Sequence, residues 1–199
     1  MKKILIIVIF ASFFYGCIND QQNEVENILI GMYQWESRTN GLVKFILVPI
    51  GQEEISIFKS SIKKYDGLTL TNKWIMLSDT SVRTVVHETG HVLGLQHEHQ
   101  RPDRDLFIKI DYDKLLDKYG LAGLYSFLYI IPELYDYQKY NYDYSSVMHY
   151  NSKNVGDVID SNGIPLSGDT PSEIDIQKIK DIYADNPRVI TYALYGFNL

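Results

Sequence analysis

The stretch HETGHVLGLQHEHQRPDRD, residues 87–105, holds four of the five histidines of this 199-residue chain. His87 and His91 are four residues apart, so on a helix both side chains project from one face, one turn apart. Two imidazoles placed in this way can bind one metal ion at about 2.0–2.1 Å. Glu88 points about 100° away from His87 on such a helix, which leaves its carboxylate beside the ion and free to act on a bound water molecule.

Gly94 decides where this helix ends and where His97 lies. Glycine at a helix end adopts the left-handed conformation that turns the chain sharply. On a continued helix, His97 would lie about 9 Å further along the axis than His91, out of reach of the same ion. With a turn at Gly94, we predict that His87, His91 and His97 bind one Zn²⁺ ion and leave its fourth position open for water, as in catalytic zinc sites. Cys17 is the only cysteine, which excludes a structural zinc site built from cysteines.

The predicted site has the parts needed to hydrolyse a peptide bond. Bound zinc lowers the pKa of its water from about 15.7 toward 7. Glu88 is the candidate general base, which takes the water proton during attack on a carbonyl carbon and returns it to the leaving amine. The oxyanion that forms needs further hydrogen-bond donors.

Together with YDYSSVMHY, residues 142–150, the histidine-rich stretch resembles the astacin family of zinc endopeptidases, a branch of the metzincins. The resemblance implies that His87, His91 and His97 bind zinc, that Glu88 is the general base, and that Met148 forms an apolar floor beneath the metal. It also implies that Tyr150 is a movable fifth ligand that supports the oxyanion. The matching positions of the two motifs are His87, Glu88, His91, Gly94, His97, Glu98, Arg101, Asp103, Arg104, Asp105, Ser146, Met148, His149 and Tyr150.

The resemblance extends to WESRT at residues 35–39 and to SEIDIQKIKDIY at residues 172–183, and so covers the chain from about Val25 to Tyr183. Family members usually contain disulfides, which a chain with one cysteine cannot form internally. We expect the charged residues after His97 to build a turn through ion pairs instead of taking part in catalysis: Arg101, Asp103, Arg104 and Asp105. For Glu98, the expected partners are Arg101, Arg104 or water.

The chain begins with two lysines and an apolar run from Ile4 to Phe14, which is typical of a secretory signal and too short to span a bilayer. Gly16 and Cys17 follow as in the lipobox of bacterial lipoproteins. We therefore predict a signal peptide over residues 1–17, a lipid anchor at Cys17, and one catalytic domain over residues 18–199. The alternative is an ordinary cleaved signal with a spare thiol. The predicted location is the bacterial cell envelope, or otherwise the secreted fraction.

The fold class that we predict is α+β and metzincin-like. The N-terminal half should hold a twisted, mixed and mostly parallel sheet, with strands within residues 42–49, 54–60 and 73–79. Two helices should accompany it, one from Val25 to a stop at Asn40-Gly41 and one within residues 79–95, capped by Asp79 or Ser81. The resemblance also implies a cleft in which an extended peptide pairs with an edge strand within residues 62–72.

The C-terminal half should be mostly irregular, with one helix within residues 170–183. Thr170 is its predicted N-cap, Pro171 its first residue, and Glu173 the residue that closes a capping box.

The formal net charge of −6 argues against binding to nucleic acid or to anionic lipid headgroups. The predicted partners are a protein or peptide substrate and, through the anchor alone, a membrane; the chain is expected to be a monomer. Two hypotheses on function remain: a zinc endopeptidase, or a catalytically inactive zinc-binding surface lipoprotein that acts in adhesion. The presence of both Glu88 and Tyr150 favours the enzyme, because an inactive protein has no chemical need for a general base.

Overall fold

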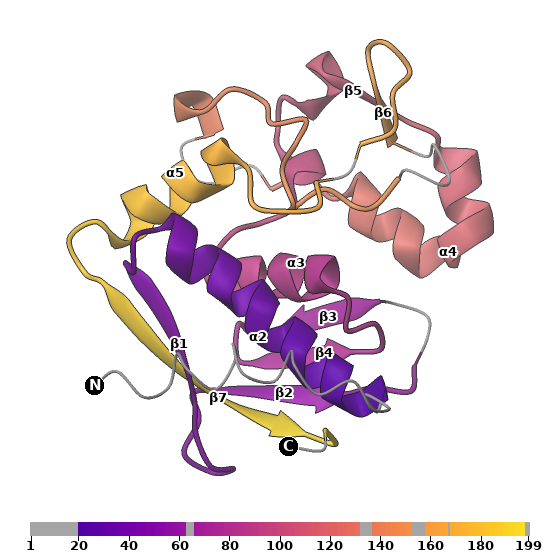
Figure 1. Ribbon diagram of the computed structural model, residues 1–199. Helices are drawn as coiled ribbons and strands as arrows, with labels where there is room; N and C mark the ends of the chain where they lie inside the picture. Colours follow the sequence, from indigo (N-terminus) through magenta and orange to yellow (C-terminus); the bar gives the residue numbers. More distant parts are fainter. Residues whose placement is uncertain (1–19, 63–65, 132–136, 153–157, 167, 198–199) are drawn as a thin grey trace.

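The computed structural model describes residues 20–62, 66–131, 137–152, 158–166 and 168–197 (Figure 1). A sheet with two helices forms one part of the molecule, and the segments after residue 97 form most of the other. The predicted signal peptide and its anchor at Cys17 lie outside the described residues. Among the helices of the described ranges, none combines the length and the apolar character that a bilayer span requires.

Five strands form the main sheet, in the order β1-β7-β2-β4-β3. The first four run parallel to one another, and β3 pairs antiparallel with β4 at the edge. The mixed, mostly parallel sheet and the edge strand were both predicted, and both are confirmed. The strand bounds are Val43–Leu47 for β1, Ile55–Lys59 for β2, Gly67–Leu70 for β3, Trp74–Leu77 for β4 and Arg188–Tyr195 for β7.

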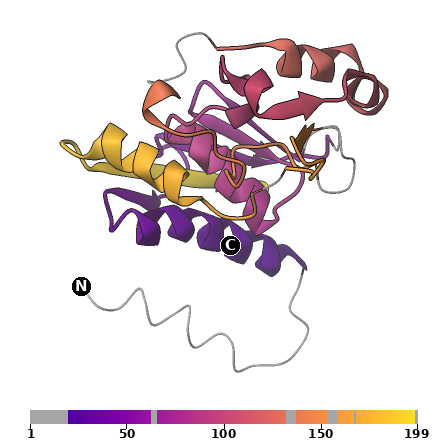
Figure 2. The same ribbon diagram turned by 90° about the horizontal axis from the view of Figure 1, so that it is seen from above.

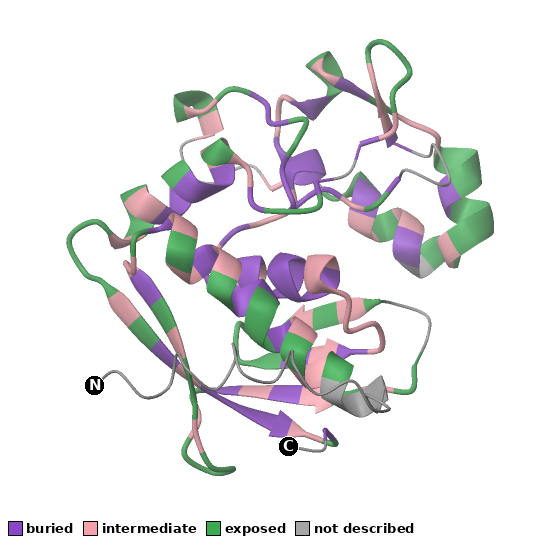
Figure 3. Ribbon diagram, in the orientation of Figure 1, coloured by how far each residue is buried: buried purple, intermediate pink, exposed green. Residues whose placement is uncertain are grey.

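Helices α2 (Asp20–Arg38) and α3 (Val82–Val92) pack on each other and on one face of this sheet. Trp35 of α2 is fully buried, and its indole Nε1–H donates a 3.0 Å hydrogen bond to the carbonyl oxygen of Val86 in α3. As Figure 3 shows, α3 is buried along most of its length, because it lies between the sheet and the C-terminal elements. The N-terminal part therefore forms a rigid support for α3.

Strand β7 comes from the segment after the last helix and lies between β1 and β2. Ile190 is fully buried, whereas its neighbour Val189 is 53% exposed, and the residues from Tyr192 to Leu194 are all buried. This strand was not predicted. Its position means that the C-terminal segment holds the two halves of the sheet together.

The C-terminal part carries a second apolar core and a helix that was not predicted, α4 (Tyr112–Leu128). Asp111 caps α4 by accepting a hydrogen bond from the Lys114 N–H, and a kink occurs at Gly120, which has a φ of 66°. Figure 2 shows α4 and α2 on opposite sides of α3. The remaining elements are β5 (Ile108–Ile110) paired with β6 (Val158–Asp160), α5 (Glu173–Tyr183), and three short 3-10 turns, Glu98–Gln100, Arg104–Leu106 and Tyr137–Lys139.

The predicted start of α5 was wrong by two residues. The N-cap is Ser172 and not Thr170, and the capping box is closed by Asp175 and not Glu173. Ser172 Oγ accepts from the Asp175 N–H at 2.9 Å, while Asp175 Oδ2 accepts from the Ser172 N–H at 3.0 Å. Pro171 consequently precedes the cap. Asp175 is preferred because its fully buried carboxylate also binds a neighbouring segment, which the exposed Glu173 could not do.

Candidate metal centre

Helix α3 presents His87 and His91 on one face, as their spacing predicts. The helix starts at its predicted cap, Ser81, whose side chain accepts a hydrogen bond from the Thr84 N–H. Both histidines lie in the second half of the helix, His91 in its last turn. Their rings meet at 88° with centroids 4.9 Å apart, so each ring can direct one nitrogen to a common point.

The predicted turn at Gly94 is present. Gly94 has a φ of +96°, a backbone conformation that residues other than glycine rarely adopt. The N–H of Leu95 donates to the Gly90 carbonyl and the N–H of Gly94 donates to the His91 carbonyl, each at 3.0 Å. These two hydrogen bonds are those of a Schellman motif, which ends the helix and reverses the chain. The reversal carries His97 back toward the face of α3 that holds the other two histidines.

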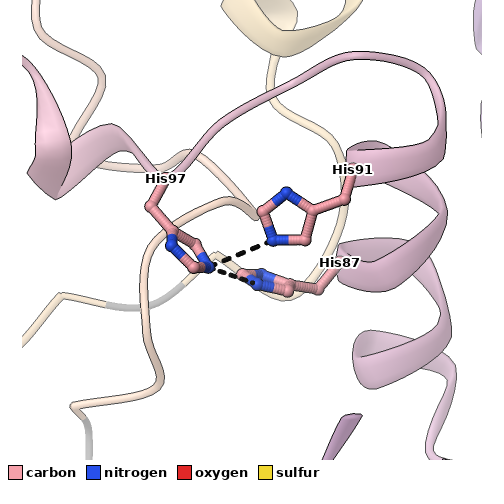
Figure 4. Close-up of side chains that lie close together, drawn as sticks. All are labelled: His87, His91 and His97. Atoms are coloured by element: carbon pink, nitrogen blue, oxygen red, sulfur yellow. Dashed lines mark hydrogen bonds between the residues drawn. The ribbon is translucent and has the colours of Figure 1, made fainter. Parts of the chain in front are cut away.

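The three histidines predicted as metal ligands converge (Figure 4). Nε2 of His97 lies 3.1 Å from Nε2 of His87 and 3.1 Å from Nε2 of His91. Two nitrogens bound to one tetrahedral zinc at about 2.0–2.1 Å lie about 3.3 Å apart. The spacing of the three nitrogens therefore fits a single ion of this kind.

Backbone carbonyls fix which ring nitrogen of two histidines carries the proton. Nδ1 of His87 lies 2.8 Å from the Val147 oxygen, and Nδ1 of His91 lies 2.8 Å from the Leu95 oxygen. A carbonyl oxygen can only accept, so each Nδ1 must be the donor and each Nε2 must present a lone pair. Both lone pairs face Nε2 of His97, an arrangement that one metal cation among the three nitrogens satisfies.

The environment also keeps these imidazoles neutral, as metal binding requires. Burial holds the pKa of His87 and of His97 well below the usual value, and the neighbouring histidines lower both further. Burial likewise lowers the pKa of His91. The set of three neutral imidazoles at tetrahedral spacing fits zinc, which binds such ligands and accepts a fourth from water.

Glu88 lies next to this set but is held by the sheet. Oε2 of Glu88 accepts a 2.6 Å hydrogen bond from Thr69 Oγ1 on β3, and the side chain passes directly against Gly67 of the same strand. Burial raises the pKa of Glu88 to about 7, although the Thr69 hydrogen bond acts in the opposite direction. A carboxyl group with a pKa near neutrality is suited to both accepting and returning a proton.

Tyr150 packs beside the histidines. Its ring centroid lies 4.8 Å from that of His97 and 4.6 Å from that of Phe127 in α4. Met148 is buried against α3, where a Cβ added to Gly90 would lie 2.6 Å from its sulfur. The structure thus places Tyr150 against His97 and Met148 against the helix that carries His87 and His91.

A cavity of about 900 Å³ opens over the three histidines. The edge strand β3 and the residues after it supply one wall, including Gly67, Thr69 and Asn72. The opposite wall comes from α4, with Lys118, Tyr119 and Ser126. An extended chain lying in this cavity would have the edge strand along one side and the histidines beneath it.

The charged residues after His97 form the predicted ion-pair network. The Arg101 guanidinium donates two 2.9 Å hydrogen bonds to the Asp103 carboxylate, from Nε and Nη2. Arg104 donates to the backbone oxygens of His99 and Phe127. Glu98 is fully buried and pairs with Arg101, one of its expected partners, at 2.9 Å.

Sequence reasoning missed several residues that support the site. Lys178 of α5 also pairs with Glu98, at 2.7 Å. Thr69 and Gly67 were placed only within a candidate edge strand. Nothing in the local sequence marks these residues, because their partners lie far away along the chain.

Comparisons with known proteins agree with this arrangement. High choriolytic enzyme 1, a hatching enzyme zinc-protease from Oryzias latipes, has a similar fold with a TM-score of 0.64 at 24% identity, over 81% of this chain and 83% of that one. Zinc metalloproteinase nas-6 of Caenorhabditis elegans is 37% identical over 109 residues, which are 50% of this chain and 30% of nas-6. Bone morphogenetic protein 1 of Xenopus laevis is 42% identical over 66 residues, 33% of this chain and 9% of that protein.

The chain therefore spans less than a third of the length of these two relatives. The family model described as Astacin, a peptidase family, matches residues 13–184, which is most of the sequence. With the three histidines, Glu88 and Tyr150 gathered in one cleft, this match identifies the chain as a member of the astacin family.

Proposed function

We propose that this chain is a zinc-dependent endopeptidase that hydrolyses peptide bonds of protein substrates. The observation that carries the proposal is the convergence of three neutral imidazoles beside the Glu88 carboxylate at the floor of a 900 Å³ cleft, with Nε2 of His97 3.1 Å from Nε2 of each of the other two. His87, His91 and His97 would hold the ion. Bound there, zinc would supply a Lewis acid that lowers the pKa of a water molecule.

Glu88 is the general base in this proposal. Its carboxylate accepts the proton of the attacking water and later delivers that proton to the nitrogen of the leaving amine. The hydrogen bond from Thr69 holds the carboxylate beside the cleft during both transfers. Tyr150, whose ring lies against His97 and lines the cleft, is the donor proposed to support the oxyanion.

The substrate would bind as an extended strand. The outer edge of β3 lines the cleft, and β3 pairs with β4 alone among the described strands. An edge strand offers unpaired N–H and C=O groups, with which a peptide can continue the sheet. Because these contacts involve only the backbone, substrates with many different side chains could bind. A protein or peptide is therefore the substrate that fits this edge.

The proposal includes one catalytic domain over residues 18–199, following a signal peptide, and a monomeric state. Lipid attachment at Cys17 and an envelope location stay predictions from the sequence. Labelling with a radioactive fatty acid would test the anchor, with Cys17→Ala as its control.

The activity is tested with denatured casein and the purified protein. We expect cleavage by wild type, loss of cleavage with a chelator and recovery on adding Zn²⁺. Glu88→Gln should bind stoichiometric zinc but lose at least about 100-fold in kcat/KM, since the general base is gone. If wild type and Glu88→Gln behave alike while both bind zinc, the protein is a non-catalytic zinc-binding protein, as in the adhesion hypothesis.

A further inference from the structure

One face of α5 carries two buried residues of opposite charge, Asp175 and Lys178, three residues apart. Asp175 is 0% exposed and Lys178 is 3% exposed. A buried charge is costly unless it is paired, so both side chains must have partners in the interior. The partners of both side chains connect α5 to the candidate metal centre. No residue of α5 is among those that line the cleft.

Asp175 binds α5 to residues 146–147, and Val147 in turn accepts a hydrogen bond from His87. Its Oδ1 accepts from Ser146 Oγ at 2.7 Å, and its Oδ2 accepts from the Val147 N–H at 3.0 Å. The oxygen of the same residue, Val147, accepts the hydrogen bond from His87 Nδ1. The position of α5 is therefore tied to one of the candidate zinc ligands.

Lys178 reaches the residue that follows another candidate ligand. Its Nζ donates to Glu98 Oε2 at 2.7 Å, and Glu98 directly follows His97. The other carboxylate oxygen accepts from Arg101 Nη1 at 2.9 Å and from the Asp143 N–H at 3.1 Å. Arg101 joins Glu98 to its own turn and to the backbone of residues 137–141, whereas Lys178 joins it to α5.

These contacts form a chain from His97 through Glu98, Lys178 and α5 to Val147 and His87. We propose that Lys178 is a positioning residue for zinc: through the Glu98 carboxylate it sets the place of His97 relative to His87. The proposal rests on the proposed zinc site but not on peptide cleavage. It predicts that zinc affinity depends on a lysine that is not among the residues lining the cleft.

A buried ion pair is stable only within a narrow range of geometries. Without the Lys178 ammonium, Glu98 keeps Arg101, but its Oε2 oxygen loses its charged donor and moves toward a new one. His97 would move with it, because the two residues are adjacent. Removing outer partners of metal ligands elsewhere costs about 10–100-fold in affinity.

The experiment compares wild type with Lys178→Met, which keeps the length of the side chain but not its charge. Lys178→Arg tests rescue by another cation. Lys180→Met is the matched control, since Lys180 lies on the same helix and is partly exposed. For each variant, zinc dissociation constants are measured by competition with a chromophoric chelator, and visible absorption bands are recorded after loading with Co²⁺.

We expect Lys178→Met to bind zinc about 10–100-fold more weakly and to show altered Co²⁺ bands. Lys178→Arg should recover part of the affinity, and Lys180→Met should match wild type. Unchanged affinity and unchanged Co²⁺ bands in Lys178→Met would overturn the proposal, even if that variant is less stable without metal. If Lys178→Met does not fold, the double variant Lys178→Met/Glu98→Gln replaces it. This variant has no buried carboxylate at position 98. The same two outcomes then support or overturn the proposal.

Zinc binding by the wild-type protein shows whether this proposal or the proposed zinc site has failed. If wild type binds no stoichiometric zinc, the zinc site itself is wrong. If wild type binds zinc and Lys178→Met binds it equally well, only the role of Lys178 is wrong.

Discussion

Thr69 Oγ1 on the edge strand β3 donates a 2.6 Å hydrogen bond to Oε2 of Glu88 on α3. The same hydroxyl lies 3.1 Å from the backbone oxygen of Glu88. One residue of the strand proposed to pair with the substrate therefore also holds the proposed general base. In the proposed mechanism, substrate binding and proton transfer would therefore both depend on this hydrogen bond.

Removing this hydroxyl should lower the rate of cleavage more than the binding of substrate. In Thr69→Val the carboxylate loses its restraint while the strand keeps its β-branched residue, so we expect kcat to fall about 10-fold. Thr69→Ser, which retains the hydroxyl, should remain close to wild type. The measurement is steady-state kinetics on a fluorogenic peptide. Equal rates for the two variants would show that the hydrogen bond has no catalytic effect.

A methyl group at position 67 should displace Glu88. A Cβ added to Gly67 would lie 2.6 Å from Glu88 Cγ and 2.7 Å from Oε1, closer than real Cβ contacts occur. We expect Gly67→Ala to lose at least about 10-fold in kcat/KM, because the general base moves, while zinc content stays at one ion per chain. Metal analysis of the same samples is the control, because loss of zinc would assign the defect to the metal site instead.

Metal removal should lower the stability of the folded protein. A ligand that binds only the folded state stabilises it by about 2.7 kcal/mol when present at 100 times its Kd. We therefore expect a chelator to lower Tm, and added Zn²⁺ to restore it. His97→Ala, with one ligand fewer, should show a much smaller shift under both treatments. A chelator-independent Tm in wild type would contradict the metal site.

His149 should make the protein sensitive to mild acid. Burial lowers the pKa of His149 to about 4, against about 6.5 in an unfolded chain. A lowered folded-state pKa contributes stability that is complete above pH 6.5 and is lost as the pH falls toward 4. This difference corresponds to about 3 kcal/mol.

We expect the free energy of unfolding of wild type to fall relative to His149→Gln by an amount of this order between pH 7 and pH 4. Urea titrations of the metal-free proteins at several pH values measure it. A constant difference between the two proteins over that range would show that His149 is not buried in its neutral form.

Strand β7 should be essential to the fold. Ile190 faces the core and is fully buried, whereas Val189, its neighbour on the other face, is 53% exposed. We expect Ile190→Asp to lose about 4 kcal/mol or more, or to prevent folding, since it buries an unpaired carboxylate. Val189→Asp should cost much less. Similar losses in urea unfolding for both variants would contradict the position of β7.

The features that the sequence predicts correctly depend on neighbours along the chain. Ser81 caps α3 and Gly94 ends it through contacts within five residues, so the three histidines could be assigned before the structure was known. The features that were missed depend on distant partners. Residues 188–195 have the composition of a strand, but their place between β1 and β2 is decided by residues more than 130 positions away.

The miss at α4 has a local cause, whereas the miss at the start of α5 depends on a segment 29 residues away. Gly120 interrupts the helical pattern of α4 with a φ of 66°, although Asp111 is an ordinary N-cap signal. At the start of α5, Thr170 and Ser172 offer similar capping hydroxyls, and the choice depends on Asp175, which also binds Ser146 and Val147. The role of Lys178 has a distant cause, because Glu98 lies 80 residues earlier in the chain.

The order of the strands has a consequence for the timing of synthesis. β7 leaves the ribosome after every other described strand, yet it occupies a place between β1 and β2, which are among the first. A nascent chain cannot complete the sheet beneath α3 until residue 195 has been translated. The sheet that supports the helix carrying His87, Glu88 and His91 is therefore complete only when this last strand has been made.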